Sequence, residues 1–203
     1  YSGIAPGCNL IMVKVLDRKG NGYSSDVLAG ISWVLERKEQ LGIRILNISV
    51  GACSKRGMSE NSALVKGVNR AWDAGLVVVV AAGNNGPRTM SITTPGISRK
   101  VITVGCSDDD REVLVGGNRM VDYSGRGPTA ACICKPDLVA PGCSVVSCSS
   151  RADKYTIKSG TSMSTPIVSG AVALLLERFP DMSNKDVKLR LRESSVDIGL
   201  PRN

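Results

Sequence analysis

Short apolar runs alternate with amphipathic stretches along the first half of the chain. The runs predict buried strands at residues 10–16, 43–50, 77–82 and 101–104. Between them, apolar residues at helical spacing predict a helix over 24–40 with Ser25 as its cap, and a second over 61–74 that Gly75 closes. Strands alternating with helices predict an α/β fold with a mostly parallel central sheet and helices on both faces.

The second half of the chain predicts shorter strands and two more helices. We expect a hairpin at 114–123 around Gly116-Gly117, and short strands at 138–140 and 145–148. A helix over 162–178 has Pro166 in its first turn, and residues 167–176 carry so few polar groups that it should be buried on nearly every side. Ser183 caps a last helix over 184–193. Because no linker or repeat interrupts the pattern, residues 1–203 are predicted to belong to one domain.

Composition narrows the range of partners. Aromatic residues make up only 3% of the chain, so aliphatic side chains must fill the core. The net charge is +8, but the basic residues are scattered and form no nucleic-acid module, so we expect a solvated basic surface and no nucleic-acid partner. No apolar run is long enough for a membrane span, and no membrane partner is predicted.

The chain has seven cysteines and no histidine. A zinc site would therefore need sulfur alone or sulfur with carboxylate, and the cysteine spacing lacks the paired C-x2-C pattern of zinc ribbons. We expect the cysteines to act as small buried hydrophobic residues and predict no metal ligand or cofactor in this chain. Their number favours a reducing compartment such as the cytoplasm, while secretion stays open because sequence ahead of Tyr1 could carry a leader.

Small polar residues gather at three points: residues 47–52, residues 81–86, and the turn Gly160-Thr161-Ser162-Met163-Ser164-Thr165-Pro166. The carboxyl ends of parallel strands share one sheet edge, where ligands bind. Each motif alone has an ordinary structural explanation, with Ser162 as a helix cap and Asn84 as a turn residue. These separate explanations do not account for the occurrence of all three motifs in this order.

Together these motifs resemble the subtilisin-like serine proteases. Stretches 12–16, 79–84, 123–129, 135–142 and 159–175 each resemble a signature of that family, in the family's order, and the resemblance covers nearly the whole chain. It implies a three-layer subtilisin-like fold and a serine endopeptidase that acts on an extended peptide or protein substrate.

The resemblance also implies roles for individual residues. Ser162 would attack the scissile carbonyl, and the Asn84 side chain would stabilise the oxyanion together with the Ser162 backbone N–H. The substrate would pair with Ser49, Val50 and Gly51. Ala82 and Gly83 would form the opposite wall of the specificity pocket, with Thr93 near its base and a cis bond between Thr94 and Pro95.

The missing histidine is the main departure from the family. Its triad runs in the order Asp, His, Ser, so both partners of Ser162 are expected ahead of Tyr1, and the chain is expected to be an N-terminally truncated, partial peptidase domain that is inactive alone. Calcium is expected only in a longer protein. Asp17 lies in a polar loop and is interpreted as a turn residue.

Two alternatives remain. A non-catalytic subtilase-like binding or regulatory module would fit the missing base, and the net charge would suit an acidic partner. An unrelated small-molecule-binding α/β protein is disfavoured because the chain has no Gly-rich phosphate loop.

Overall fold

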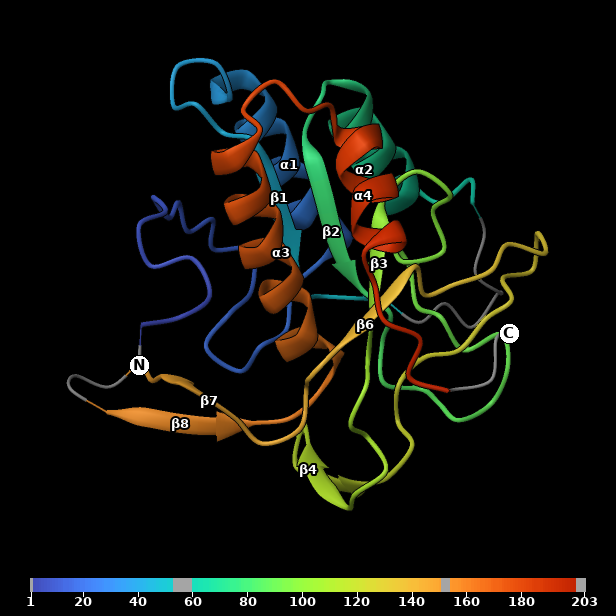
Figure 1. The fold of residues 1–203 in the computed structure, drawn as a ribbon. Helices are drawn as coiled ribbons and strands as arrows, with labels where there is room; N and C mark the ends of the chain where they lie inside the picture. Colours follow the sequence, from blue (N-terminus) through green and yellow to red (C-terminus); the bar gives the residue numbers. More distant parts are fainter. Residues whose placement is uncertain (1, 53–59, 151–153, 200–203) are drawn as a thin grey trace.

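The computed structural model describes residues 2–52, 60–150 and 154–199. Its centre is a sheet of parallel strands in the order β1-β2-β3-β6 (Figure 1). The strands are β1 (Ile45–Ile48), β2 (Val77–Ala81), β3 (Ile102–Cys106) and β6 (Leu138–Ala140). The parallel sheet expected from the apolar runs is confirmed, with bounds that differ by a few residues.

Helices cover both faces of this sheet and give three layers (Figure 1). Helices α1 (Ser24–Arg37) and α2 (Ala63–Asp73) lie on one face, and α3 (Thr161–Arg178) and α4 (Asn184–Glu193) on the other. Every residue of β2 is buried, which explains why this strand is apolar throughout rather than alternating. The three-layer α/β prediction is therefore correct.

Aliphatic side chains fill the core between the layers. Val78, Val79 and Val80 have no exposed surface, and the flanking helices add buried residues that include Trp72 from α2 and Val172 from α3. Burial of this kind stabilises the fold by about 25 cal/mol per Å² of apolar surface. The low aromatic content of the sequence thus corresponds to a core built mainly from valine, isoleucine and leucine.

Two antiparallel hairpins lie outside the central sheet. Strands β4 (Val113–Val115) and β5 (Asn118–Met120) turn at Gly116-Gly117, as predicted. Strand β7 (Val145–Cys148) pairs with β8 (Tyr155–Lys158). The sequence pattern predicts β7 but not β8. Within the described residues, no helix combines the length and the apolar character that crossing a membrane would require.

The strand predicted at 10–16 is absent. Leu10 and Met12 are 80% and 89% exposed, whereas Val13 and Val15 lie against Gly30 of α1. An apolar run forms a strand only where a neighbouring strand offers N–H and C=O groups, and no other described segment pairs with this one.

The N-cap of α1 also differs from the prediction. It is Tyr23, one residue before the helix, and its backbone N–H donates to the Asp26 carboxylate over 3.2 Å. Ser25 lies inside the first turn. The carboxylate of Asp26 therefore takes over the capping role that we expected from a serine hydroxyl.

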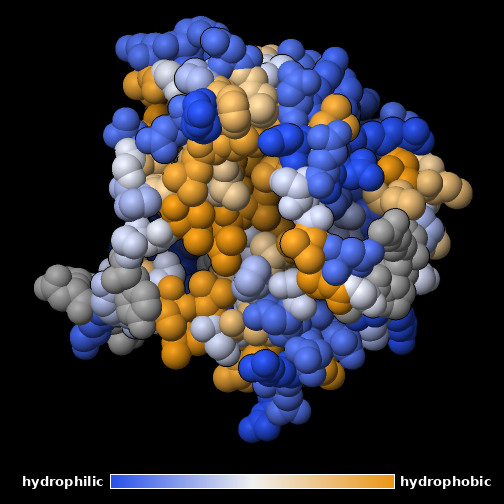
Figure 2. All heavy atoms as spheres, viewed as in Figure 1, coloured by the Kyte–Doolittle hydropathy of each residue, from blue (hydrophilic) through white to orange (hydrophobic). Residues whose placement is uncertain are grey.

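Helix α3 departs from expectation in two respects. It begins at Thr161, so Pro166 lies in the second turn and removes the N–H that the Ser162 carbonyl would otherwise accept. The helix is also not buried on all sides, because Pro166 is exposed and Leu174 is 43% exposed. Figure 2 shows apolar surface over this part of the molecule.

Candidate active site

Ser162 lies where the turn at residues 160–166 meets the carboxyl end of β1. Its Oγ donates a hydrogen bond to the Ser49 carbonyl over 2.9 Å, and its side chain is half-buried. Ser162 is also in the first turn of α3, where backbone N–H groups lack partners within the helix and the helix dipole favours negative charge. The geometry combines a positioned hydroxyl with backbone donors.

Asn84 reaches the same rim from the end of β2. Its Oδ1 accepts from the Thr161 backbone N–H and from Thr161 Oγ1, each over 3.0 Å. Because a backbone N–H can only donate, these bonds identify the amide oxygen and leave Nδ2 as the free donor side. A Cβ placed on Gly160 would lie 3.3 Å from Asn84 Nδ2. The structure thus brings Asn84 and Ser162 to one edge of the sheet, as predicted.

Thr161 positions this amide, a role that the sequence pattern does not indicate. Its fully buried hydroxyl accepts from the Gly83 N–H over 3.1 Å and donates to Asn84 Oδ1. Its carbonyl accepts from Thr165 Oγ1 over 2.7 Å. The signal that could have revealed it was its place directly before the serine of the turn.

Thr93 lies between two of the glycines at the predicted cleft. A Cβ on Gly51 would be 2.6 Å from Thr93 Oγ1, and one on Gly83 would be 2.5 Å from the same oxygen. Thr93 donates its N–H to Ala82 over 2.8 Å. The structure therefore gathers Gly51, Ala82, Gly83 and Thr93 at one place, and Ser49 lies two residues before Gly51.

The neighbouring backbone fits the same arrangement. Val50 contacts the main core, and the predicted cis bond between Thr94 and Pro95 is present. Beyond Ile48, β1 leaves the ladder with β2, and the described residues offer 49–51 no other strand.

No described ionisable side chain hydrogen-bonds to Ser162. Asp17 forms a turn elsewhere: its carboxylate accepts the N–H groups of Asn21 and Lys19, and these bonds hold the pKa of Asp17 below its ordinary value. The interpretation of Asp17 as a turn residue is thus correct.

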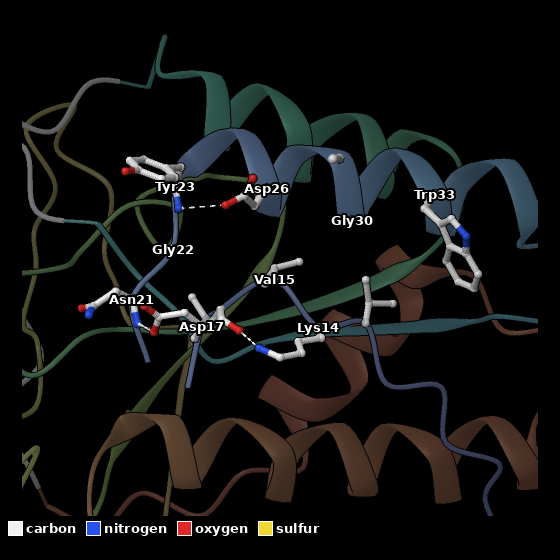
Figure 3. Close-up of a pocket in the computed structure, with 12 residues that line it drawn as sticks. Lys14, Val15, Asp17, Asn21, Gly22, Tyr23, Asp26, Gly30 and Trp33 are labelled. Carbon is white, nitrogen blue, oxygen red and sulfur yellow. Dashed lines mark hydrogen bonds between the residues drawn. The ribbon is translucent and has the colours of Figure 1, made fainter. Parts of the chain in front are cut away.

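A hollow of about 830 Å³ is lined by residues 13–17 and by residues of α1 (Figure 3). Lys14, Tyr23 and Trp33 help to line it, and Ser162 and Asn84 do not. It is therefore separate from the candidate active site.

The cysteines only partly match the expectation that they are buried. Cys106 is buried and Cys143 half-buried, but four others are exposed: Cys8, Cys132, Cys134 and Cys148. All six are free thiols, and Cys53 lies outside the described residues. One group among the described residues could hold a metal ion, namely Cys106, Asp108 and Cys143. None of these three residues belongs to the stretches 47–52, 81–86 and 160–166.

Similarity to known proteins agrees with this geometry. The sequence pattern of the Subtilase family matches residues 1–202. Serine protease AprX of Bacillus subtilis is 39% identical over 96% of this chain and 48% of its own length. Subtilisin DY of Bacillus licheniformis is 34% identical over 97% of this chain and 64% of its own length. The chain therefore spans about half to two thirds of these relatives.

Solved structures show the same relationship. Sphericase superimposes with a TM-score of 0.77 at 33% identity, over 94% of this chain and 61% of its own. A cold-adapted subtilisin-like serine proteinase gives a TM-score of 0.78 at 29% identity, over 97% of this chain and 63% of its own. With its three-layer fold and its serine turn at the carboxyl edge of the sheet, the chain belongs to the subtilase family of serine proteases.

Proposed function

We propose that this chain carries the nucleophile and the oxyanion site of a serine endopeptidase. The observation that carries the proposal is that Ser162 directly follows Thr161 at the start of α3. Ser162 Oγ donates to the Ser49 carbonyl, and Thr161 holds the amide of Asn84 in place. Ser162 Oγ forms an ester with the scissile carbonyl carbon, and its proton passes through a base to the leaving amine. Water then hydrolyses the ester and restores the serine.

The oxyanion site stabilises the charge that develops on the carbonyl oxygen. Asn84 Nδ2 and the Ser162 N–H are its donors. In a subtilisin, loss of the oxyanion-site asparagine costs about 2.7–4 kcal/mol of transition-state stabilisation. Because Asn84 Oδ1 is already bonded to Thr161, the amide needs little reorganisation as the reaction proceeds.

We place the base outside residues 1–203, because these residues include no histidine and no described ionisable side chain bonds to Ser162. Serine without a base is a weak nucleophile at neutral pH. The 203-residue chain alone should therefore cleave peptides no faster than its Ser162→Ala variant. A longer protein that supplies the base should be active.

The substrate is an extended peptide that pairs with 49–51. The residues that form the walls of the primary pocket include Ala82, Gly83 and Thr93. None of the stretches 49–52, 81–85 and 91–95 contains Asp or Glu, so the pocket suits uncharged, mostly apolar side chains. No metal or cofactor takes part in the peptidase chemistry proposed for this chain, and calcium would belong to the longer protein.

Covalent labelling tests the proposal. A fluorophosphonate should label the longer protein at Ser162, and the label should disappear in Ser162→Ala but persist in Ser164→Ala. Labelling of another residue, or peptide cleavage by Ser162→Ala, would contradict the assignment.

A binding or regulatory module is the second candidate, and the missing histidine is the observation that favours it. A longer protein that binds extended peptides but neither reacts with the phosphonate nor cleaves them would support this alternative.

A further inference from the structure

Two cysteines and a carboxylate converge behind the nucleophile turn. Cys106 is the last residue of β3, Asp108 follows in the next loop, and Cys143 lies in the turn between β6 and β7. Their ligand atoms all lie within 4.8 Å of one another, and Cys106 Sγ is 3.1 Å from Asp108 Oδ1. Cys106 and Cys143 are 37 positions apart in sequence, yet their sulfurs both lie close to a carboxylate oxygen of Asp108.

Tyr123 links the two thiols. It is completely buried, and its hydroxyl lies 3.2 Å from Cys106 Sγ and 3.1 Å from Cys143 Sγ. The same hydroxyl donates to the Gly142 carbonyl over 3.3 Å. The phenol thus orients both sulfurs, as groups around metal ligands commonly do.

The charge around the cluster is negative and has no basic partner. Neither Asp108 nor the neighbouring Asp109, which is 7% exposed, forms an ion pair within the described residues. Asp108 Oδ1 instead accepts the N–H groups of Gly142 and Cys143 over 2.7 and 3.1 Å. A carboxylate that forms no ion pair within the described residues and lies beside two sulfurs is a setting that a cation would stabilise.

A second observation points to the same place. Ser164 Oγ is fully buried and has no hydrogen-bond partner among the described residues. A Cβ on Gly142 would overlap Ser164 Oγ and would lie 2.8 Å from Cys106 Sγ. The Ser164 hydroxyl and the cysteine cluster therefore both lie next to Gly142.

We propose that Cys106, Cys143 and Asp108 bind a divalent cation of borderline softness, for which Zn²⁺ is the best fit. Thiolate sulfur excludes the harder Mg²⁺ and Ca²⁺, which take oxygen ligands, whereas zinc accepts both Cys and Asp. Tetrahedral zinc with Zn–S of about 2.3 Å and Zn–O of about 2.1 Å places its ligands roughly 3.5–3.8 Å apart. Only small side-chain shifts separate the observed cluster from that geometry.

Binding of Zn²⁺ at this site releases protons from the thiols. Each thiol loses one proton as its sulfur binds, so Zn²⁺ and two thiols give a dithiolate complex and two protons, while Asp108 binds as the carboxylate it already is. A water molecule would complete the set of four ligands. No oxidant or reductant is needed.

The site supports the nucleophile turn from behind. The Gly142 carbonyl accepts the Gly160 N–H over 2.9 Å, and Gly160 immediately precedes α3. A cation that fixes Cys143 to the end of β3 fixes Gly142 and hence the start of the helix that carries Ser162. The cation is structural and takes no part in the peptidase chemistry.

Cobalt titration of the 203-residue chain, reduced with a phosphine and kept anaerobic, tests the site directly. One equivalent of Co²⁺ should give an intense near-ultraviolet thiolate-to-metal band, and one equivalent of Zn²⁺ should abolish it. Cys106→Ser and Cys143→Ser should each weaken cobalt binding by at least about 100-fold. The control is the double variant Cys132→Ser/Cys134→Ser, which removes an exposed Cys-x-Cys pair and should bind as the wild type does.

Thermal unfolding gives a readout that does not depend on the spectrum. Zn²⁺ at about 100 times its Kd should raise the Tm of the wild type by roughly 5–10 °C and leave Cys143→Ser unchanged. A wild-type cobalt spectrum without the thiolate band would overturn the proposal, even if both cysteine variants failed to fold. So would loss of binding in the Cys132/Cys134 variant, or a Cys106–Cys143 disulfide that forms in air while zinc is not retained.

Discussion

The Thr161 hydroxyl donates to Asn84 Oδ1 over 3.0 Å and accepts the Gly83 N–H over 3.1 Å. One side chain from the start of α3 thereby fixes the amide and the backbone that follow β2. The turn at residues 160–166 and the carboxyl end of β2 are thus joined by hydrogen bonds rather than by apolar packing alone. The orientation of Asn84 therefore depends on a residue that need not touch the substrate.

Thr161→Val tests this connection. The substitution keeps the shape of the side chain but leaves the Gly83 N–H without its acceptor and Asn84 Oδ1 with one donor fewer. We expect the free energy of unfolding to fall by about 1–3 kcal/mol, as measured by urea denaturation. Thr161→Ser keeps the hydroxyl and should lose clearly less. Equal losses in the two variants would show that the methyl group, not the hydroxyl, stabilises the turn.

Gly83→Ala should destabilise the cleft wall for two reasons. Gly83 has a φ of +95°, and its added Cβ would lie 2.5 Å from Thr93 Oγ1. Backbone strain and overpacking together should lower the free energy of unfolding by about 2–5 kcal/mol. Gly75→Ala is the matched control, because Gly75 has a φ of +90° and nothing within 4 Å of the added Cβ. A loss no larger than that of Gly75→Ala would refute the close contact with Thr93.

Ser164→Ala should stabilise the metal-free protein. The Ser164 hydroxyl is buried without a partner, so removing it relieves a desolvation penalty of about 1–3 kcal/mol. Ser169 lies on the same helix, and its Oγ donates to Asn47 Oδ1 or the Thr165 carbonyl. Ser169→Ala should therefore lose stability in the same urea assay. If Ser164→Ala lost stability as well, the hydroxyl must have a partner in solution.

The sequence predicted those elements whose pattern is sufficient by itself. Strand β2 is buried along its whole length, so its continuous apolar run predicts it correctly. Ser183 likewise predicts the start of α4. Strand β8 was missed because its residues are mostly exposed and it is held by pairing with β7. The apolar run at 10–16 predicts a strand that the structure lacks. An apolar run does not show whether a partner strand exists.

The same distinction applies to the candidate site. The roles of Ser162 and Asn84 are predicted because their motifs, taken together and in order, resemble those of one family. The contacts of Thr161 with Asn84 join residues 77 positions apart, and the cysteine cluster joins the end of β3 to the turn after β6. Local periodicity carries no information about such contacts, so only the folded chain reveals them.

Lys135 should make stability depend on pH. Burial lowers the pKa of its ammonium group from 10.5 to about 8, although Asp137 accepts from its Nζ over 2.5 Å. Between these pH values the unfolded chain binds a proton that the folded chain has released, so the free energy of unfolding should rise with pH. At about 1.4 kcal/mol per pH unit, the rise is at most roughly 3 kcal/mol.

Comparison with Lys135→Met isolates this effect. Methionine fills a similar volume without the charge, and Lys188 still donates to Asp137 and to the Val101 carbonyl. The difference in free energy of unfolding, wild type minus variant, should be flat below pH 8 and increase up to pH 10.5. A difference that stayed constant or fell over that range would show that Lys135 keeps its ordinary pKa in the folded chain.

The last prediction concerns cleavage specificity in a longer protein that supplies the base. The described residues around Thr93 present small uncharged side chains, and Gly51 and Gly83 pack against it from two sides. A buried Lys or Arg side chain would lose its hydration here without a carboxylate to pair with. An apolar side chain is instead held by burial of its surface, and one methylene changes its binding by only about 1–3 kcal/mol. Cleavage should therefore be broad, with large apolar residues favoured before the scissile bond. A peptide-library profile measures this directly, and dominant cleavage after Arg or Lys would mean that a carboxylate reaches the pocket from another segment.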